Sequence, residues 1–149
     1  MDASETVANY FSELLEKMNR QTTARPSAPV FSEQDQVIFY IVSTRCEMDI
    51  NGIESVFDQL LTETELQLLI DSLRKVDAIR LADLFDQALQ RLRSAGYFDH
   101  ESTMVSDLKD SQGVRMLADL EQAIRENDGL WELDERLACV IRSEAPESP

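Results

Sequence analysis

The chain has 149 residues, of which 29 are Asp or Glu and 14 are Lys or Arg, so its formal net charge is −15. Its hydrophobic fraction of 43 % excludes an acidic disordered tail, because such segments lack the residues that build a core. The negative charge disfavours nucleic acid and anionic membranes as partners and attracts basic proteins. A simpler interpretation is that the acidity serves only solubility.

The first half of the chain predicts helices separated by clear breaks. Apolar residues at spacings of three and four predict a helix over residues 4–20. Residues 21–30 contain two prolines and predict a linker. Ser32 is expected to cap a second helix. That helix should end at Asn51-Gly52, because both residues tolerate the left-handed conformation.

The second half continues the helical pattern. A short helix is expected over residues 53–61, and Thr62 with Glu65 has the spacing of a capping box that opens the next helix. Later helices are expected over 77–93, 111–124 and 133–141. Residues 97–106 give no clear pattern.

These elements predict an all-α protein, a single compact domain of about seven or eight helices. Its organisation is expected to comprise three parts: an N-terminal helix and Pro-containing linker (1–31), the main helical domain (32–147) and a tail (148–149). The expected core residues are Ile41, Phe57, Leu69, Leu73, Leu84, Phe85 and Leu120.

Candidate catalytic and metal-binding residues are few. His100 is the only histidine and has no His or Cys at ligand spacing, so we expect no metal. Cys46 and Cys139 lack a C-x-x-C spacing and are expected to be small core fillers in a reducing, cytoplasmic environment. No phosphate-binding glycine pattern or nucleophile elbow occurs, so neither a cofactor nor catalysis is expected. No apolar run approaches the roughly 20 residues that cross a bilayer.

The acidic residues form two groups beside predicted bends. The corner group, Asp49, Glu54 and Asp58, surrounds Asn51-Gly52. Glu54 and Asp58 are four residues apart, which on a helix is about 6 Å along the axis, close to the spacing of phosphates on one DNA strand. The C-terminal group consists of Asp128, Glu132, Asp134 and Glu135. Both groups are candidate partner-binding surfaces, and solvated helix faces are the alternative interpretation.

Neutralising the corner group is a direct test of this idea. An exposed charge usually changes the free energy of unfolding by less than about 0.5 kcal/mol. The changes Asp49→Asn, Glu54→Gln and Asp58→Asn together are therefore expected to leave the fold intact and to weaken binding of a basic partner.

Two segments carry a resemblance to a known family. The corner runs from Glu47 through Asn51-Gly52-Ile53-Glu54-Ser55 to Phe57, and a later segment runs from Leu73 to Ala82 and on to Ala88. They are similar to the Asn-Gly-Gly-Phe-x-Gln corner and the Leu-x-x-Ile-Gly-Ala-x-x-x-Ala segment of the bacterial DNA-mimic protein domain family. The chain's ending, with Pro146 after Val140-Ile141-Arg142, is also similar, so the resemblance spans residues 32–147. The chain departs from the family pattern at Asn51, Ile53, Ser55 and Asp77.

The resemblance implies a helical, non-catalytic protein that occupies the DNA-binding surface of a basic protein, such as a helix-turn-helix repressor. A toxin-neutralising, immunity-type protein that recognises its partner by shape is the alternative. An enzyme of another type is a third hypothesis, and a homodimer stays open. Strong weakening of partner capture with rising salt would favour the first over the second.

Overall fold

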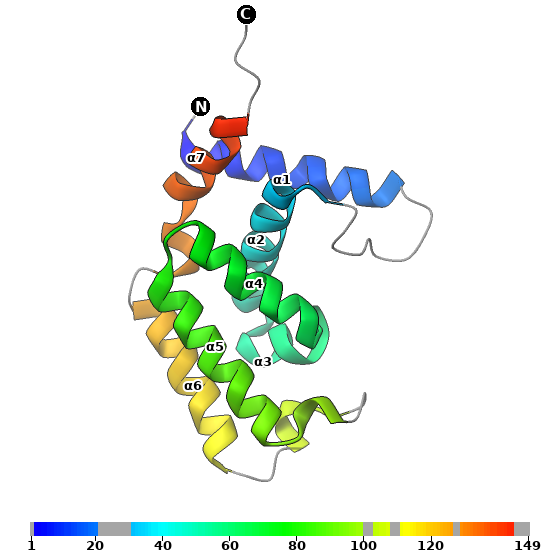
Figure 1. Ribbon diagram of the computed structural model, residues 1–149, viewed down its shortest axis with the longest axis vertical. Helices are drawn as coiled ribbons and strands as arrows, with labels where there is room; N and C mark the ends of the chain where they lie inside the picture. Colours follow the sequence, from blue (N-terminus) through cyan, green and yellow to red (C-terminus); the bar gives the residue numbers. More distant parts are fainter. Residues whose placement is uncertain (1, 21–30, 100–102, 108–110, 127–128, 145–149) are drawn as a thin grey trace, which may run out of the picture.

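The computed structural model describes residues 2–20, 31–99, 103–107, 111–126 and 129–144 (Figure 1). This part of the chain forms seven α-helices and no strand, which confirms the predicted all-α domain. The helices are α1 (Ala3–Arg20), α2 (Glu33–Asn51), α3 (Ile53–Ser55), α4 (Glu63–Lys75), α5 (Ile79–Ser94), α6 (Ser111–Glu126) and α7 (Asp134–Glu144). A π-helical turn, η2 (Val56–Leu60), follows α3, and three 3-10 turns are η3 (Tyr97–Asp99), η4 (Val105–Asp107) and η5 (Leu130–Glu132).

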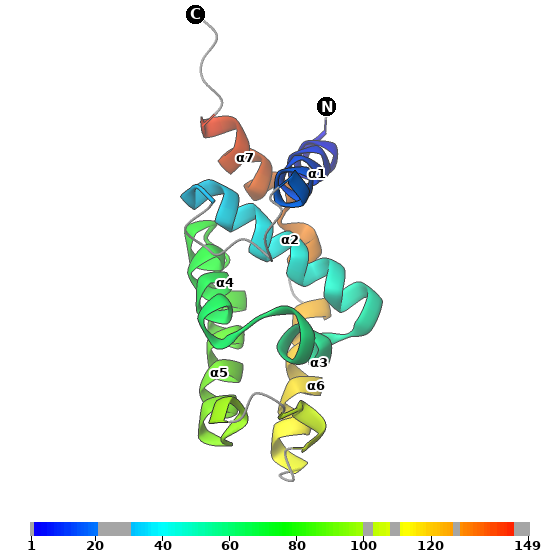
Figure 2. The ribbon, with the colours of Figure 1, turned by 90° about the vertical axis from the view of Figure 1, so that its right-hand side faces the viewer.

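Helix α2 is the central element of the fold. All six residues from Val37 to Val42 are buried, so this stretch has no polar face. A helix that is apolar all round must be covered on every side. Helix α1 packs against α7 and α2, α4 packs against α2 and α5, and α6 packs against α5 (Figures 1 and 2).

Local side-chain chemistry sets several helix ends. The predicted capping box of Thr62 and Glu65 is present, and the predicted cap Ser32 also forms a capping box, with Asp35. In each box the cap side chain accepts a hydrogen bond from the backbone N–H of the third helical residue, whose carboxylate accepts one from the backbone N–H of the cap residue. Gly52 and Gly96 follow α2 and α5 with φ of 84° and 78°. Only glycine adopts this region at little cost, so both glycines end a helix.

The predicted core is largely confirmed. Six of its members are buried: Ile41, Phe57, Leu69, Leu73, Phe85 and Leu120. Leu84 is only half-buried. On α5 the buried stripe passes through Leu81, Phe85 and Leu89, and Leu84 lies at its edge.

The expectation that both cysteines fill the core is wrong, because Cys46 and Cys139 are exposed. On α2 the buried residues near Cys46 are Thr44 and Met48, four positions apart on one face. Cys46 lies two positions from each and therefore on the opposite face.

Helix α1 packs into the same core as the rest of the chain. Its Val7 and Leu14 are buried, and the Tyr10 hydroxyl donates to the Asp35 carboxylate at 2.5 Å. Lys17 Nζ lies 3.6 Å from the other Asp35 oxygen. The predicted linker at 21–30 and the tail at 148–149 lie outside the described residues. In the part of the chain that the structure describes, no helix combines the length and apolar character needed to cross a bilayer.

Candidate interaction surface

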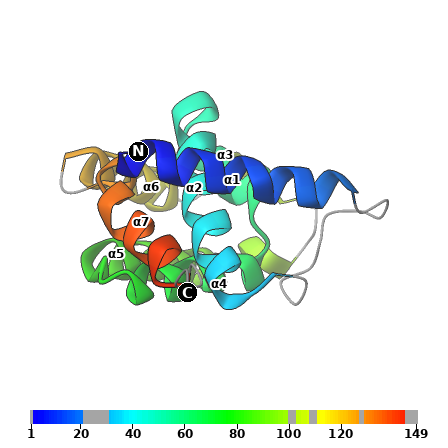
Figure 3. The same ribbon diagram turned by 90° about the horizontal axis from the view of Figure 1, so that it is seen from above.

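The corner between α2 and α3 protrudes at the C-terminal end of α2 (Figures 2 and 3). Ile50, on the last turn of α2, is 77 % exposed, more than any other large hydrophobic side chain among the described residues. Asp49 and Glu54 are exposed as well. The corner therefore exposes one large apolar side chain, and an exposed acidic residue lies on each side of it in the sequence.

An ion pair on α6 holds this corner. Arg125 Nη2 donates to the Met48 carbonyl in the last turn of α2 at 3.3 Å. The Glu121 carboxylate accepts from the backbone N–H of Ile53, the first residue of α3, at 3.5 Å. Arg125 and Glu121 are themselves 3.2 Å apart. One pair of side chains thus contacts the end of one helix and the start of the next.

The side chain of Glu47 on α2 joins the last residue of α2 to the last residue of α3. Its Oε1 atom accepts hydrogen bonds from the Asn51 amide at 2.9 Å and from the Ser55 hydroxyl at 2.5 Å. Asn51 thus contributes an internal side-chain contact, and Gly52 contributes the positive φ. The two residues expected to form a structural corner do so by different means.

Asp58 does not share the surface of Asp49 and Glu54. Its Oδ1 atom accepts hydrogen bonds from the Tyr97 hydroxyl at 2.6 Å and from the Val105 N–H at 2.9 Å. Burial and the Asp58 carboxylate raise the pKa of the Tyr97 phenol well above its usual range. The chain changes from α-helix to the π-helical turn η2 before Asp58, so the evenly spaced pair expected on one continuous helix is not formed.

The C-terminal group is also divided. Asp134 pairs with Arg45 of α2 at 2.7 Å, and both side chains are mostly buried. Arg45 also donates to the Leu130 carbonyl at 3.4 Å, so the pair joins α2 to the start of α7. Glu132 and Glu135 are exposed, and Asp128 lies outside the described residues.

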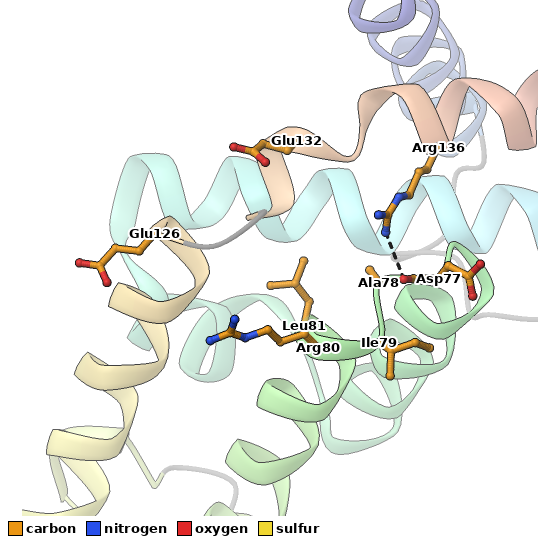
Figure 4. Close-up of a pocket in the computed structure, with 8 residues that line it drawn as sticks. All are labelled: Asp77, Ala78, Ile79, Arg80, Leu81, Glu126, Glu132 and Arg136. Carbon is orange, nitrogen blue, oxygen red and sulfur yellow. Dashed lines mark hydrogen bonds between the residues drawn. The ribbon is translucent and has the colours of Figure 1, made fainter.

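A pocket of about 280 Å³ opens where the α4–α5 turn faces α7 (Figure 4). Arg136 of α7 donates to the carbonyl oxygens of Val76 at 3.4 Å and Asp77 at 3.1 Å. Asp77 has a positive φ of 60°, and the following Ala78 N–H donates to the Leu73 carbonyl at 2.9 Å, which is the Schellman arrangement of a helix end. Arg136 is therefore used to hold this turn.

The described residues contain no group of three His, Cys, Asp or Glu side chains that could hold a metal ion. Desolvation raises the pKa of the Cys46 thiol, which lowers its thiolate fraction at neutral pH. His100 lies outside the described residues.

Comparison of the chain with protein-family models, with curated proteins and with solved structures found no match. The resemblance of the corner thus depends on the sequence motifs quoted above.

Sequence reasoning missed Ile50, Glu121 and Arg125. The one local signal for Ile50 is its place directly before the helix-ending Asn51-Gly52, where the chain turns away from the core. Nothing local links Glu121 and Arg125 to the corner, because they are about 70 positions further along the chain.

Proposed function

We propose that this chain is a non-catalytic acidic protein that binds a basic protein through the α2–α3 corner, at a partner surface that otherwise contacts DNA. The observation that carries the proposal is the 77 % exposure of Ile50, next to Asp49 in the sequence and close to the exposed Glu54 on the same corner. The ion pair of Glu121 and Arg125 fixes the backbone beneath these side chains. A fixed corner binds at a lower entropic cost than a loose loop.

The charge distribution supports a basic partner. Among the described residues, six basic side chains are engaged in ion pairs with carboxylates: Lys17, Arg45, Arg74, Lys75, Arg93 and Arg125. The net charge of −15 persists after this pairing, because each pair removes one charge of each sign. A field of this sign speeds encounter with a basic surface and weakens as salt is added.

The backbone at two positions supports the family resemblance. Gly52 and Asp77 both have positive φ, and the family has glycine at each corresponding position. Asp tolerates this conformation better than most other residues. The departure at Asp77 is therefore compatible with the backbone that the family motif requires.

The exposure of Ile50 also favours a second candidate function. A surface that imitates the phosphates of DNA has no need of an exposed apolar side chain. An interface that depends on shape complementarity is commonly held by a hydrophobic side chain that becomes buried in the partner. An immunity-type protein that neutralises a toxin would use the corner in this way, with the acidity serving solubility.

The two candidates separate in a partner-capture experiment. The wild type, Asp49→Asn/Glu54→Gln and Ile50→Ser are used to capture partners from native lysate, and association with the purified partner is then measured at low and high salt. Binding at a DNA-contacting surface predicts slower association in the doubly neutralised variant, a strong salt dependence and competition by the partner's DNA. Recognition by shape complementarity predicts that Ile50→Ser abolishes binding and that salt has little effect on the association rate.

Glu5→Gln/Glu13→Gln is the matched control, since it removes the same charge from exposed positions on α1. If both corner variants bind the captured partner like this control, the corner is not the binding surface.

A further inference from the structure

A second cavity lies beyond the corner, where η2 meets η3. Its volume is about 360 Å³, and most of its wall is apolar or aromatic: Phe57, Leu61, Tyr97, Phe98 and Met104. The rings of Tyr97 and Phe98 meet edge to face with centroids 4.9 Å apart. Small-molecule pockets usually span about 300–1,000 Å³, so this cavity has the size for one side chain or a similarly small group.

The cavity also contains negative charge. Asp58 uses its Oδ1 atom for both of its hydrogen bonds, to Tyr97 and Val105, and its Oδ2 atom makes none to a described residue. The other carboxylate of the cavity, Glu63, is paired with Arg93 at 2.7 Å. Asp58 is therefore the carboxylate that an occupant of the cavity would meet.

The charge decides which class of occupant fits. A neutral apolar group would cover the Asp58 carboxylate without giving it a partner, which costs free energy. An anion would be repelled. A cation is attracted by the carboxylate and by the faces of the aromatic rings, and an alkyl stem can pack on Phe57 and Met104.

We propose that this cavity binds the cationic side chain of an Arg or Lys residue presented by a basic polypeptide. The inference rests on the proposed function in that the partner is basic, and it adds a second site and the residue type that enters it. Asp58 does not share the surface of Asp49 and Glu54, so the cavity is a contact site separate from the corner.

The test uses isolated probes and the full chain. Nα-acetyl-L-arginine amide is titrated while the NMR signal of the Met104 methyl group is followed. Its neutral isostere, Nα-acetyl-L-citrulline amide, is the matched ligand control. We expect a saturable shift of Met104 with the arginine probe and binding at least about fivefold weaker with citrulline.

Two variants assign the effect to the cavity. Asp58→Asn keeps an acceptor oxygen for Tyr97 and Val105 but removes the charge, and should bring arginine binding down to the level of citrulline. Asp49→Asn removes a charge at the corner and should leave probe binding unchanged. If Asp58→Asn does not fold, Phe98→Leu keeps the wall apolar and should still weaken arginine binding by loss of the ring face.

Equal binding of the two probes, or no shift of Met104 up to the solubility limit of the arginine probe, would overturn the proposal. The titration contains no partner protein, so its outcome is independent of the corner variants. Probe binding without partner capture contradicts the proposed function alone, and partner capture without probe binding contradicts this inference alone.

Discussion

Asp58→Ala is expected to destabilise the fold much more than removal of an exposed carboxylate. Asp58 accepts two hydrogen bonds, at 2.6 and 2.9 Å, from Tyr97 and Val105, which are 6 % and 0 % exposed. Hydrogen bonds to charged groups contribute about 1.5–3 kcal/mol each, and a buried donor without a partner costs a similar amount. Because Asp58 itself is half-buried, we expect a loss of roughly 2–4 kcal/mol in the free energy of unfolding.

A short variant series isolates the contribution of the hydrogen bonds. Asp58→Asn retains an acceptor oxygen and should cost about 1 kcal/mol, and Tyr97→Phe, which removes one donor, should cost about 1–1.5 kcal/mol. The double variant Asp58→Ala/Tyr97→Phe should lose less than the sum of the two single changes, because no buried hydroxyl is left unpaired. Urea unfolding followed by far-ultraviolet circular dichroism, extrapolated linearly to water, gives each value.

Glu54→Ala is the control, since Glu54 is an exposed acid of the same group. It should change the free energy of unfolding by less than about 0.5 kcal/mol. If Asp58→Ala is no more destabilising than this control, Asp58 behaves as a surface charge. The sequence-based expectation for the corner group would then hold after all.

Two further predictions concern backbone strain and pH. Asp77→Gly should stabilise the fold by about 0.5–1 kcal/mol in the same urea assay, because glycine adopts the φ of 60° without the penalty of a Cβ atom, and Asp77→Ala should be destabilising. The raised pKa of Tyr97 means that the unfolded chain loses this proton first, near pH 10, so the stabilisation is complete below that pH and declines above it. The difference in unfolding free energy between wild type and Tyr97→Phe should therefore shrink above about pH 10, and a constant difference up to pH 11 would contradict the assignment.

The helices were predictable because their signals are local. Ser32 and Thr62 cap helices through residues only three positions away, and Gly52 and Gly96 mark helix ends through their own backbone conformation. The π-helical turn η2 was not predicted. Its residues have ordinary helical spacing, and the hydrogen bonds of Asp58 in this turn come from residues that lie much later in the chain.

The sequence could not separate the acids that hold the fold from those that face solvent. Glu54 and Asp58 have the same charge and lie on the same short segment, yet Glu54 is exposed and Asp58 binds Tyr97, which is 39 positions away. Asp134 is likewise bound by Arg45, which lies on a different helix. Such pairings depend on the packed arrangement of helices and leave no periodic pattern in the sequence.

The loss of these acids from the surface changes what the corner can do. Asp58 is half-buried and bound to Tyr97, so the corner group has two fully exposed members, Asp49 and Glu54, and Ile50 lies between them in the sequence. Two carboxylates around an apolar side chain do not reproduce an extended row of phosphates. If the proposed corner binds a basic partner, we expect the long-range attraction to come from the net charge of the whole chain and the bound complex to depend on the packing of Ile50. Charge changes at a rim mainly alter association rates, and loss of a buried anchor mainly alters dissociation rates. For a partner that uses both features of the corner, we therefore expect Asp49→Asn/Glu54→Gln to lower the association rate and Ile50→Ser to raise the dissociation rate. A change in only one of the two rates would favour one candidate function over the other.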